Sequence, residues 1–321
     1  MSVENILKKI YENVAHPAAF SSVYKLYKAA QNEDPSITQR QVIDWLNKNH
    51  AYTLHRRIVK KFYRRPVLVR GPQYQYQADL LFFKSLFHSN RGIRYLLTVI
   101  DCFSRFACIV GVKSKESAGV LEALKQAFEF MGYPKKLQTD KGGEFDSKLA
   151  IKFYEENNII WFHTDQELKA QICERFNRTI REKLVKYMTA KKTFRYIDAI
   201  PDLIYAYNSS PHSSLGGKIA PKDVNMKNRN KVYDILYGDY LKAKKKKNRF
   251  SEGDTIRITR FRDKIEKKNL SNFSNKLFTV VQVLNTNPPT YRIYDPEDDF
   301  IIPGAFYEPQ MQKFELKNNN D

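Results

Sequence analysis

The sequence predicts an α/β core built on a mixed sheet, with a small helical domain before it and a small β-barrel after it. Residues 74–113 carry three closely spaced strand-like runs. Residues 117–210 alternate amphipathic helices with short apolar strands, and residues 250–315 hold short β runs between turn residues. The predicted divisions are a helical domain at 1–54, a basic linker at 55–72, the core at 73–225, a second basic linker at 226–249, the barrel at 250–315 and a disordered tail at 316–321.

Two helices around a turn are predicted in the first segment. The run FSSVYKLYKAAQ places apolar residues at helical spacing, namely Phe20, Val23, Tyr24, Tyr27 and Ala30. After the break DPS, Thr38 and Gln41 form a capping-box pattern at the start of a second helix. This arrangement is compatible with a helix-turn-helix that lies in a DNA groove, and equally with a plain helical hairpin.

A run of basic pairs, RRIVKKFYRR, follows the helices. Its cations recur every four residues and are Arg56, Arg57, Lys60, Lys61, Arg64 and Arg65. A helix would gather them in one stripe, and an extended arm would still offer them to phosphates. A solvated connector is the alternative, but six cations without an acid favour contact with nucleic acid.

The core begins with three strands, at 74–83, 94–103 and 105–113, that predict an antiparallel meander. An amphipathic helix follows, capped by Ser117 and ended by Gly132. The remaining runs predict strands at 136–140 and 159–164 and helices at 147–158, 167–190 and 194–210. We expect Pro201 to kink or break the last helix.

The last segment is preceded by the basic linker LKAKKKKNRF, which holds Lys244, Lys245, Lys246 and Lys247. Four β runs follow, at 252–261, 277–285, 290–296 and 300–307, and predict a small barrel. Its aromatic residues could include a cage for methylated lysine, although most must fill the barrel core. The aromatics are Phe261, Phe273, Phe278, Tyr291, Tyr294 and Tyr307.

The net charge of +20 is spread over the whole chain, so an extended polyanion such as nucleic acid is the expected partner. A merely soluble basic protein is the alternative. No stretch approaches the roughly 18–20 apolar residues of a membrane helix. The three cysteines form no C-x-x-C pair, so neither a disulfide framework nor a cysteine zinc site is expected, and a reducing compartment is the simpler assumption.

Three carboxylates stand out by position. Asp79 lies inside an apolar strand, Asp140 ends a strand just before two glycines, and Glu174 lies on the long helix. Carboxylate oxygens are the ligands that Mg²⁺ prefers, and two such ions can serve phosphoryl transfer. The chain holds 35 acids, so spacing alone leaves competitors. Those competitors are Asp101 as a turn former, and Glu144, Asp146, Asp165 and Glu167 as helix caps.

Four blocks in order carry a resemblance to known proteins. They are YQADL at 76–80, VIDCFSR at 99–105, QTDKGGEF at 138–145 and ERFNRT at 174–179. Together they resemble the catalytic core of retroviral-type integrases, which belong to the DDE transposase superfamily and have an RNase H-like fold. Sixty residues separate the two aspartates and 33 separate Asp140 from Glu174, close to the family spacing. The flanks, including an SH3-like barrel, resemble Polinton/Maverick and related retroelement integrases.

The resemblance implies roles for individual residues. Asp79, Asp140 and Glu174 would be the catalytic ligands of two Mg²⁺ (or Mn²⁺) ions. Arg178 and Arg181 lie on the same helix face as Glu174 and would contact DNA. Lys141 and Asn177 would also lie near DNA, with Asn177 equally able to bond the active-site loop.

The implied activity is DNA integration, with processing of the 3′ end of an element followed by strand transfer into target DNA. Double-stranded DNA and further copies of the chain, as a tetramer or larger, are the implied partners. The implied location is the nucleus, or a viral particle or factory, with room for a chromatin tether. Two alternatives stay open: a host-adopted, non-catalytic DNA- or chromatin-binding derivative, and an RNase H-like nuclease. The zinc module of retroviral integrases is not expected, because His16, His50 and His55 have no nearby cysteines.

Overall fold

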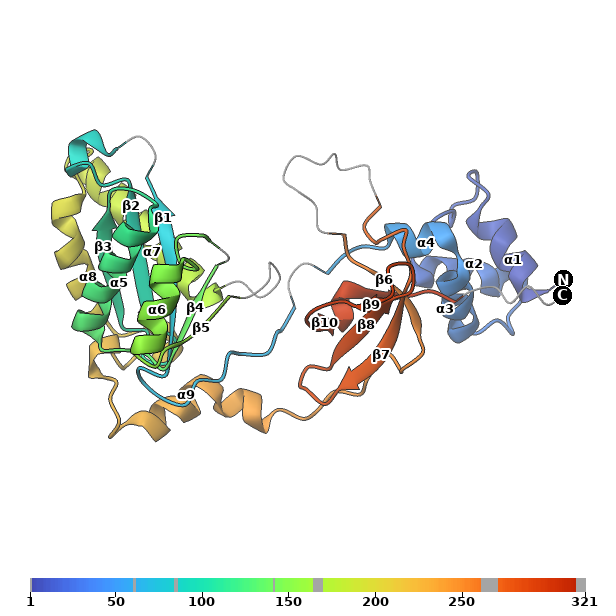
Figure 1. The fold of residues 1–321 in the computed structure, drawn as a ribbon. Coiled ribbons are helices and arrows are strands. Elements are labelled where there is room, and N and C mark those ends of the chain that lie inside the picture. The colour runs from blue at the N-terminus through green and yellow to red at the C-terminus, as the bar shows by residue number, and fades with distance from the viewer. Residues whose placement is uncertain are drawn as a thin grey trace. The chain divides into compact units, whose positions relative to one another are not determined.

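The computed structural model describes residues 2–59, 62–83, 86–140, 142–163, 170–260 and 271–315. The chain divides into two compact units (Figure 1). The first unit combines the two ends of the chain, Met1–Arg65 and Ala243–Asp321. The second unit is the continuous segment Pro66–Lys242. No helix in the described parts of the chain is long and apolar enough to cross a membrane.

A mixed five-stranded sheet organises the central unit. Its strands run in the order β3-β2-β1-β4-β5, with antiparallel pairing between β1, β2 and β3 and parallel pairing from β1 through β4 to β5. The strands are β1 (Gln75–Phe82), β2 (Tyr95–Asp101), β3 (Ala107–Val112), β4 (Lys136–Thr139) and β5 (Ile160–His163). This confirms the predicted meander and the mixed sheet of an RNase H-like core.

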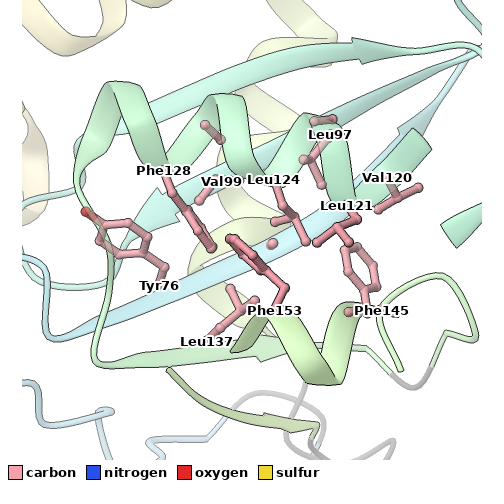
Figure 2. Close-up of a cluster of buried hydrophobic side chains, with 14 of the residues drawn as sticks. Tyr76, Leu97, Val99, Val120, Leu121, Leu124, Phe128, Leu137, Phe145 and Phe153 are labelled. Atoms are coloured by element: carbon pink, nitrogen blue, oxygen red, sulfur yellow. The ribbon is translucent and has the colours of Figure 1, made fainter. Parts of the chain in front are cut away.

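Helices cover both faces of this sheet. On one face, α5 (Ser117–Met131) and α6 (Lys148–Glu156) pack on the sheet through a cluster that includes Leu124, Phe128 and Phe153 (Figure 2). On the other face, α7 (Gln171–Ala190) and α8 (Ile200–Ser209) pack through a separate cluster. Each large apolar side chain buried in these clusters contributes roughly 1.5–3 kcal/mol.

The ends of two helices, α5 and α8, can be compared with the sequence predictions. Gly132 ends α5 as predicted, with a φ of 84° that disfavours other residues. Ser117 does not cap α5: it is the first helical residue, and its hydroxyl donates to the Gly143 carbonyl at 3.2 Å. Pro201 does not break α8 but lies in its first turn, where its missing N–H is not needed.

The segment predicted as the second basic linker holds a helix, α9 (Arg229–Lys242). Its apolar residues are not gathered on one face, so helical periodicity did not reveal it. Short 3₁₀ turns also occur in this unit, at His88–Asn90, Ile197–Ala199, Ser213–Leu215 and Pro221–Asp223.

Four helices form the first part of the other unit: α1 (Val3–Tyr11), α2 (Val23–Glu33), α3 (Gln39–Lys48) and α4 (His50–His55). The Thr38–Gln41 capping box of α3 is confirmed. Only part of the predicted apolar face of α2 is buried. Of the predicted residues, Ala30 is fully buried, whereas Phe20 and Tyr24 are 56% and 63% exposed. Leu26, which was not among the predicted residues, is also fully buried. Phe20 precedes the helix, which begins after the cap Ser22.

Six short strands complete this unit as an antiparallel sheet of order β10-β8-β7-β6-β11, with β9 paired to β8. They are β6 (Thr255–Ile258), β7 (Phe278–Leu284), β8 (Thr290–Asp295), β9 (Phe300–Ile301), β10 (Phe306–Tyr307) and β11 (Met311–Lys313). This sheet is consistent with the predicted barrel. Phe273, Phe278, Tyr291 and Tyr307 are buried, so these four do not form an open cage, and Phe278 and Tyr291 belong to the apolar core of this sheet; Phe261 lies outside the described residues.

The helices and the C-terminal sheet are joined by buried polar contacts. The Leu54 carbonyl accepts hydrogen bonds from the backbone N–H groups of Asn272 and Phe273 at 2.9 and 3.1 Å. Arg257, only 1% exposed, donates to the carbonyls of Ser274 and Asn275 and to the hydroxyl of Thr53. Two segments at opposite ends of the sequence therefore fold as one body.

Candidate active site

Strand β1 presents three polar side chains on one face, because alternate residues of a strand point the same way. These are Gln75, Gln77 and Asp79. Asp79 accepts a hydrogen bond from the backbone N–H of Leu80 at 2.8 Å and another from the Asn177 amide at 2.7 Å. The carboxylate is therefore oriented toward α7, where Asn177 resides.

Asp140 follows the last residue of β4. The parallel register pairs Gln77 with Gln138, and continuing it by two residues brings Asp140 beside Asp79. Electrostatics agree with this placement. Burial raises the pKa of Asp140, the neighbouring carboxylates of Asp79 and Glu144 raise it further, and Lys115 opposes them. The edge of the sheet thus gathers negative charge with one lysine close by.

Helix α7 brings Glu174 to the same region. Cys173, the residue before it, is fully buried, and its thiol lies 3.5 Å from the Thr98 hydroxyl. Burial raises the pKa of the Cys173 thiol, and the charges of Asp79, Glu174 and Asp140 all raise it further. The geometric link between α7 and the aspartates is Asn177, three residues after Glu174, whose amide donates to Asp79 at 2.7 Å.

Asn177 is a site residue whose partner the sequence left open. Its amide nitrogen donates to Asp79, and the side chain is only 7% exposed. Its amide oxygen is buried and has no hydrogen-bond partner among the described residues. An unsatisfied buried acceptor costs about 1–3 kcal/mol, so this oxygen is available to a group that enters the site.

Two buried glutamines were missed by the sequence reasoning. The Gln77 carbonyl oxygen accepts from the backbone N–H groups of Ile172 and Cys173, at 3.1 and 3.0 Å. The amide nitrogen of Gln77 donates to the Gln138 oxygen at 3.0 Å. The only sequence signal was the presence of polar residues in otherwise apolar strands, at alternate positions that lead up to each aspartate.

The competing acids fall into other roles. Asp101 is buried and accepts from the backbone N–H groups of Gln73 and Phe103 and from the hydroxyl of Ser104, which confirms it as a turn former. Ser147 caps α6, so the expectation that Glu144 or Asp146 caps it is wrong. Glu144 instead pairs with Lys115 at 3.3 Å. Asp165 and Glu167 lie outside the described residues.

The predicted DNA-contacting residues lie in both units. Arg178 and Arg181 are exposed on α7, and the Arg181 guanidinium lies 5.4 Å from the Phe83 ring centroid. Arg56 donates to Gln312, Arg64 lies over the Phe62 ring, and the Arg65 backbone donates to the Tyr307 hydroxyl. Arg57 and Lys244–Lys247 are on the unit that contains the barrel, with Lys245 donating to Asn285 at 2.9 Å. Lys60, Lys61 and Lys141 lie outside the described residues.

The donor set suits a hard divalent cation. In the described part of the chain, no three Asp, Glu, His or Cys side chains form a cluster tight enough to hold a metal ion. Magnesium, however, is commonly held by one or two carboxylates, with water and substrate phosphates completing its octahedron. The mutual repulsion between Asp79 and Asp140, and the unpaired oxygen of Asn177, are features that a bound cation and its waters would relieve.

Comparisons with known proteins give a consistent result. The family model described as the integrase core domain matches residues 69–167. A transposon-derived protein of Caenorhabditis elegans is 30% identical over 216 residues, which cover 67% of this chain and 70% of that protein. A retrovirus-related Pol polyprotein from transposon 297 of Drosophila melanogaster is 28% identical over 135 residues, 41% of this chain and 13% of the polyprotein.

A solved structure shares the fold over most of the chain. It is a chain of the simian T-cell lymphotropic virus intasome, solved in complex with the PP2A regulatory subunit B56 gamma. The alignment covers 91% of this chain and 95% of that chain, with a TM-score of 0.62 and 13% sequence identity. At this identity the likeness concerns the fold.

Proposed function

The chain belongs to the integrase core domain family of transposon and retroviral proteins, and we propose that it is a DNA integrase of a mobile element or virus. The observation that supports this proposal is that the register of β1 and β4 brings Asp140 beside Asp79, while Asp79 accepts a hydrogen bond from Asn177, three residues after Glu174 on α7. One fold can host many activities, so function depends on the residues of the site. The flanking segments favour relatives among the Polinton/Maverick and related retroelement integrases.

In this proposal, Asp79, Asp140 and Glu174 hold two Mg²⁺ (or Mn²⁺) ions. When bound, the ions would activate the attacking hydroxyl and neutralise charge on the leaving oxygen. Asn177 keeps the Asp79 carboxylate turned into the site through its hydrogen bond. Its free amide oxygen can accept a hydrogen bond from a water or from the sugar of the DNA end.

The proposed reaction has two in-line phosphoryl transfers. A water first attacks a phosphodiester near the 3′ end of the element, and the strand leaves with a 3′ hydroxyl. That hydroxyl then attacks a phosphodiester of target DNA, forming one bond to phosphorus while the target strand breaks with its own 3′ hydroxyl released. Each step exchanges one P–O bond for another and needs no redox partner.

Cations in both units are proposed to hold the DNA. Arg178 and Arg181 continue the face of α7 that carries Glu174, so they can neutralise phosphates next to the reacting bond. Lys141 would act beside them. The other proposed contacts are Arg56, Arg57, Lys60, Lys61, Arg64, Arg65 and Lys244–Lys247, next to a barrel that we propose is SH3-like. Two DNA ends must be joined together, so we propose a tetramer or larger, working in the nucleus or a viral particle, with a chromatin tether as a further partner.

The experiment is a strand-transfer assay with Mg²⁺ or Mn²⁺, a labelled duplex carrying the element's ends, and plasmid target. We compare the wild type with Glu174→Gln, which keeps size and hydrogen bonding but removes the charge. Glu182→Gln is the matched control, because Glu182 is also exposed on α7 but lies two turns away. The proposal expects joining by the wild type and the control, and none by Glu174→Gln.

Two results would overturn it. If the wild type binds DNA without joining it, the non-catalytic derivative is correct. If it nicks DNA without joining it, the chain is an RNase H-like nuclease.

A further inference from the structure

The start of helix α7 does not follow the usual rule for helix ends. The first backbone N–H groups of a helix need acceptors, which Ser, Thr, Asp or Asn at the N-cap commonly supply. Here the N-cap is Ala170, which has no side-chain acceptor. The missing acceptor comes from another element: Gln77 of β1 receives the N–H groups of Ile172 and Cys173 with one oxygen.

The same glutamine also binds the third element of the site. Its amide nitrogen donates to Gln138 of β4, and Gln75 donates to that same oxygen at 3.2 Å. All three glutamines are buried. One side chain therefore joins β1, β4 and α7 at a single point inside the protein.

Each proposed catalytic carboxylate follows this junction at a short, fixed distance along its own element. Asp79 comes two residues after Gln77, Asp140 two residues after Gln138, and Glu174 directly after Cys173. A shift at the junction would therefore move all three carboxylates relative to one another.

A second contact fixes the helix along its axis. Asn177, one turn beyond Cys173, donates to Asp79, two residues beyond Gln77. Two strand residues span about 6.6 Å and four helix residues span about 6 Å, so both contacts form in only one register. Sliding α7 by one residue would break both contacts together.

We propose that Gln77 is the positioning residue that sets Asp79, Asp140 and Glu174 in one register, by capping α7 and binding Gln138. This inference rests on the proposed function, because it assigns Gln77 to the same site. It predicts a loss of metal affinity and turnover that exceeds what a general loss of stability would produce.

Gln75 supplies a matched control within the chain. It lies on the same face of β1, is buried, and donates to the same oxygen of Gln138, but this hydrogen bond does not involve α7. We therefore compare Gln77→Leu with Gln75→Leu in the full-length protein. Amide hydrogen exchange at Ile172 and Cys173, Mn²⁺ affinity by titration calorimetry, and KM and kcat of strand transfer are measured for both.

For Gln77→Leu, we expect exchange at Ile172 and Cys173 to be about 10-fold faster, as for a lost helix cap. Mn²⁺ affinity should fall about 10- to 100-fold, with strand transfer reduced mainly in kcat, the range seen when groups that orient metal ligands are removed. Gln75→Leu should leave all of these near the wild-type values. Gln77→Glu, whose carboxylate can still accept both N–H groups, should restore the protection at Ile172 and Cys173.

Equal changes in Gln77→Leu and Gln75→Leu would overturn the proposal, and so would unchanged exchange at Ile172 and Cys173. If Gln77→Leu does not fold, Gln77→Asn takes its place, since it stays polar but is one methylene too short to reach the helix. The exchange measurement does not depend on joining DNA. A wild type that joins no DNA would therefore end the proposed function while the exchange data still decide the role of Gln77.

Discussion

The two compact units reach stability in different ways. Pro66–Lys242 is one continuous segment with an apolar cluster on each face of its sheet, and its buried glutamines gather where the carboxylates are. The other unit is assembled from both ends of the chain, and buried polar contacts such as those of Arg257 join its halves. In the central unit some of the buried polar groups surround the proposed site, whereas in the other unit buried polar groups join the two ends of the chain.

This difference separates what mutations should do in each unit. Removing apolar volume from the central unit should weaken folding without altering how its carboxylates are set. Removing polar groups near the carboxylates should weaken activity more than folding. Removing the buried polar contacts that join the halves of the other unit should uncouple the two chain ends.

The largest expected effect is on the core of the central unit. Phe128 is fully buried between α5 and the sheet (Figure 2), so Phe128→Ala should lower the free energy of unfolding by about 3–5 kcal/mol. Phe130→Ala is the control, because Phe130 is on the same helix but 61% exposed, and it should change stability by less than about 0.5 kcal/mol. Chemical denaturation of both variants measures the difference. Equal losses would mean that this cluster is not the core.

A smaller loss of stability is expected where Arg257 joins the two chain ends. Arg257→Met keeps much of the apolar stem but leaves the carbonyls of Ser274 and Asn275 and the Thr53 hydroxyl without their donor. We expect a loss of about 1–3 kcal/mol. Hydrogen exchange should rise in α4 as well as in β6, although they lie about 200 residues apart. Arg292→Met, at an exposed position of β8, is the control, and a rise confined to β6 would refute the coupling of the chain ends.

Asn177→Ala tests the polar groups beside the carboxylates. It removes the donor that orients Asp79, so strand transfer should fall about 10- to 100-fold, which corresponds to roughly 1.4–2.7 kcal/mol in the barrier. Stability should change little, because the variant also removes an unsatisfied buried oxygen. Kinetic assays and thermal unfolding on the same preparation measure both quantities. A large loss of stability with unchanged turnover would place Asn177 in folding alone.

The smallest effect is expected at the cap of α6. The Ser147 hydroxyl accepts from the Ala150 N–H at 3.2 Å, so Ser147→Ala should lower stability by about 1 kcal/mol. Asp146→Ala is the neighbouring control and should have no such effect, since Asp146 does not cap the helix. Thermal unfolding at one protein concentration compares them. The reverse order would reassign the cap to Asp146.

The sequence predicted those structural features that depend on residues close together in the chain. The meander of β1 to β3 follows from alternation, the capping box at Thr38 from two residues three apart, and the end of α5 from Gly132. The proposed site acids come from motif blocks in which each carboxylate follows its own short pattern, and their role stays a prediction.

The sequence could not predict contacts between distant residues. The acceptor for the start of α7 is 95 residues away on β1, and the Arg257 contact with Thr53 spans 204 residues. Local rules also assigned Ser117 the wrong role, because Glu116 is the N-cap of α5. They assigned Pro201 the wrong role because the first turn of a helix tolerates proline. Helix α9 was missed because its sequence lacks an apolar stripe.

The most direct test of the account is strand transfer by three single variants, Asp79→Asn, Asp140→Asn and Glu174→Gln, and by the double variant Asp79→Asn/Glu174→Gln. The controls are Asp146→Asn and Glu182→Gln. If the three carboxylates build one site, the strand-transfer rate of each single variant should fall at least about 100-fold, which is more than removal of an orienting group costs. The rate of the double variant should fall no further than that of the single variants. A single variant that binds DNA and joins it at the wild-type rate would show that its carboxylate lies outside the active site.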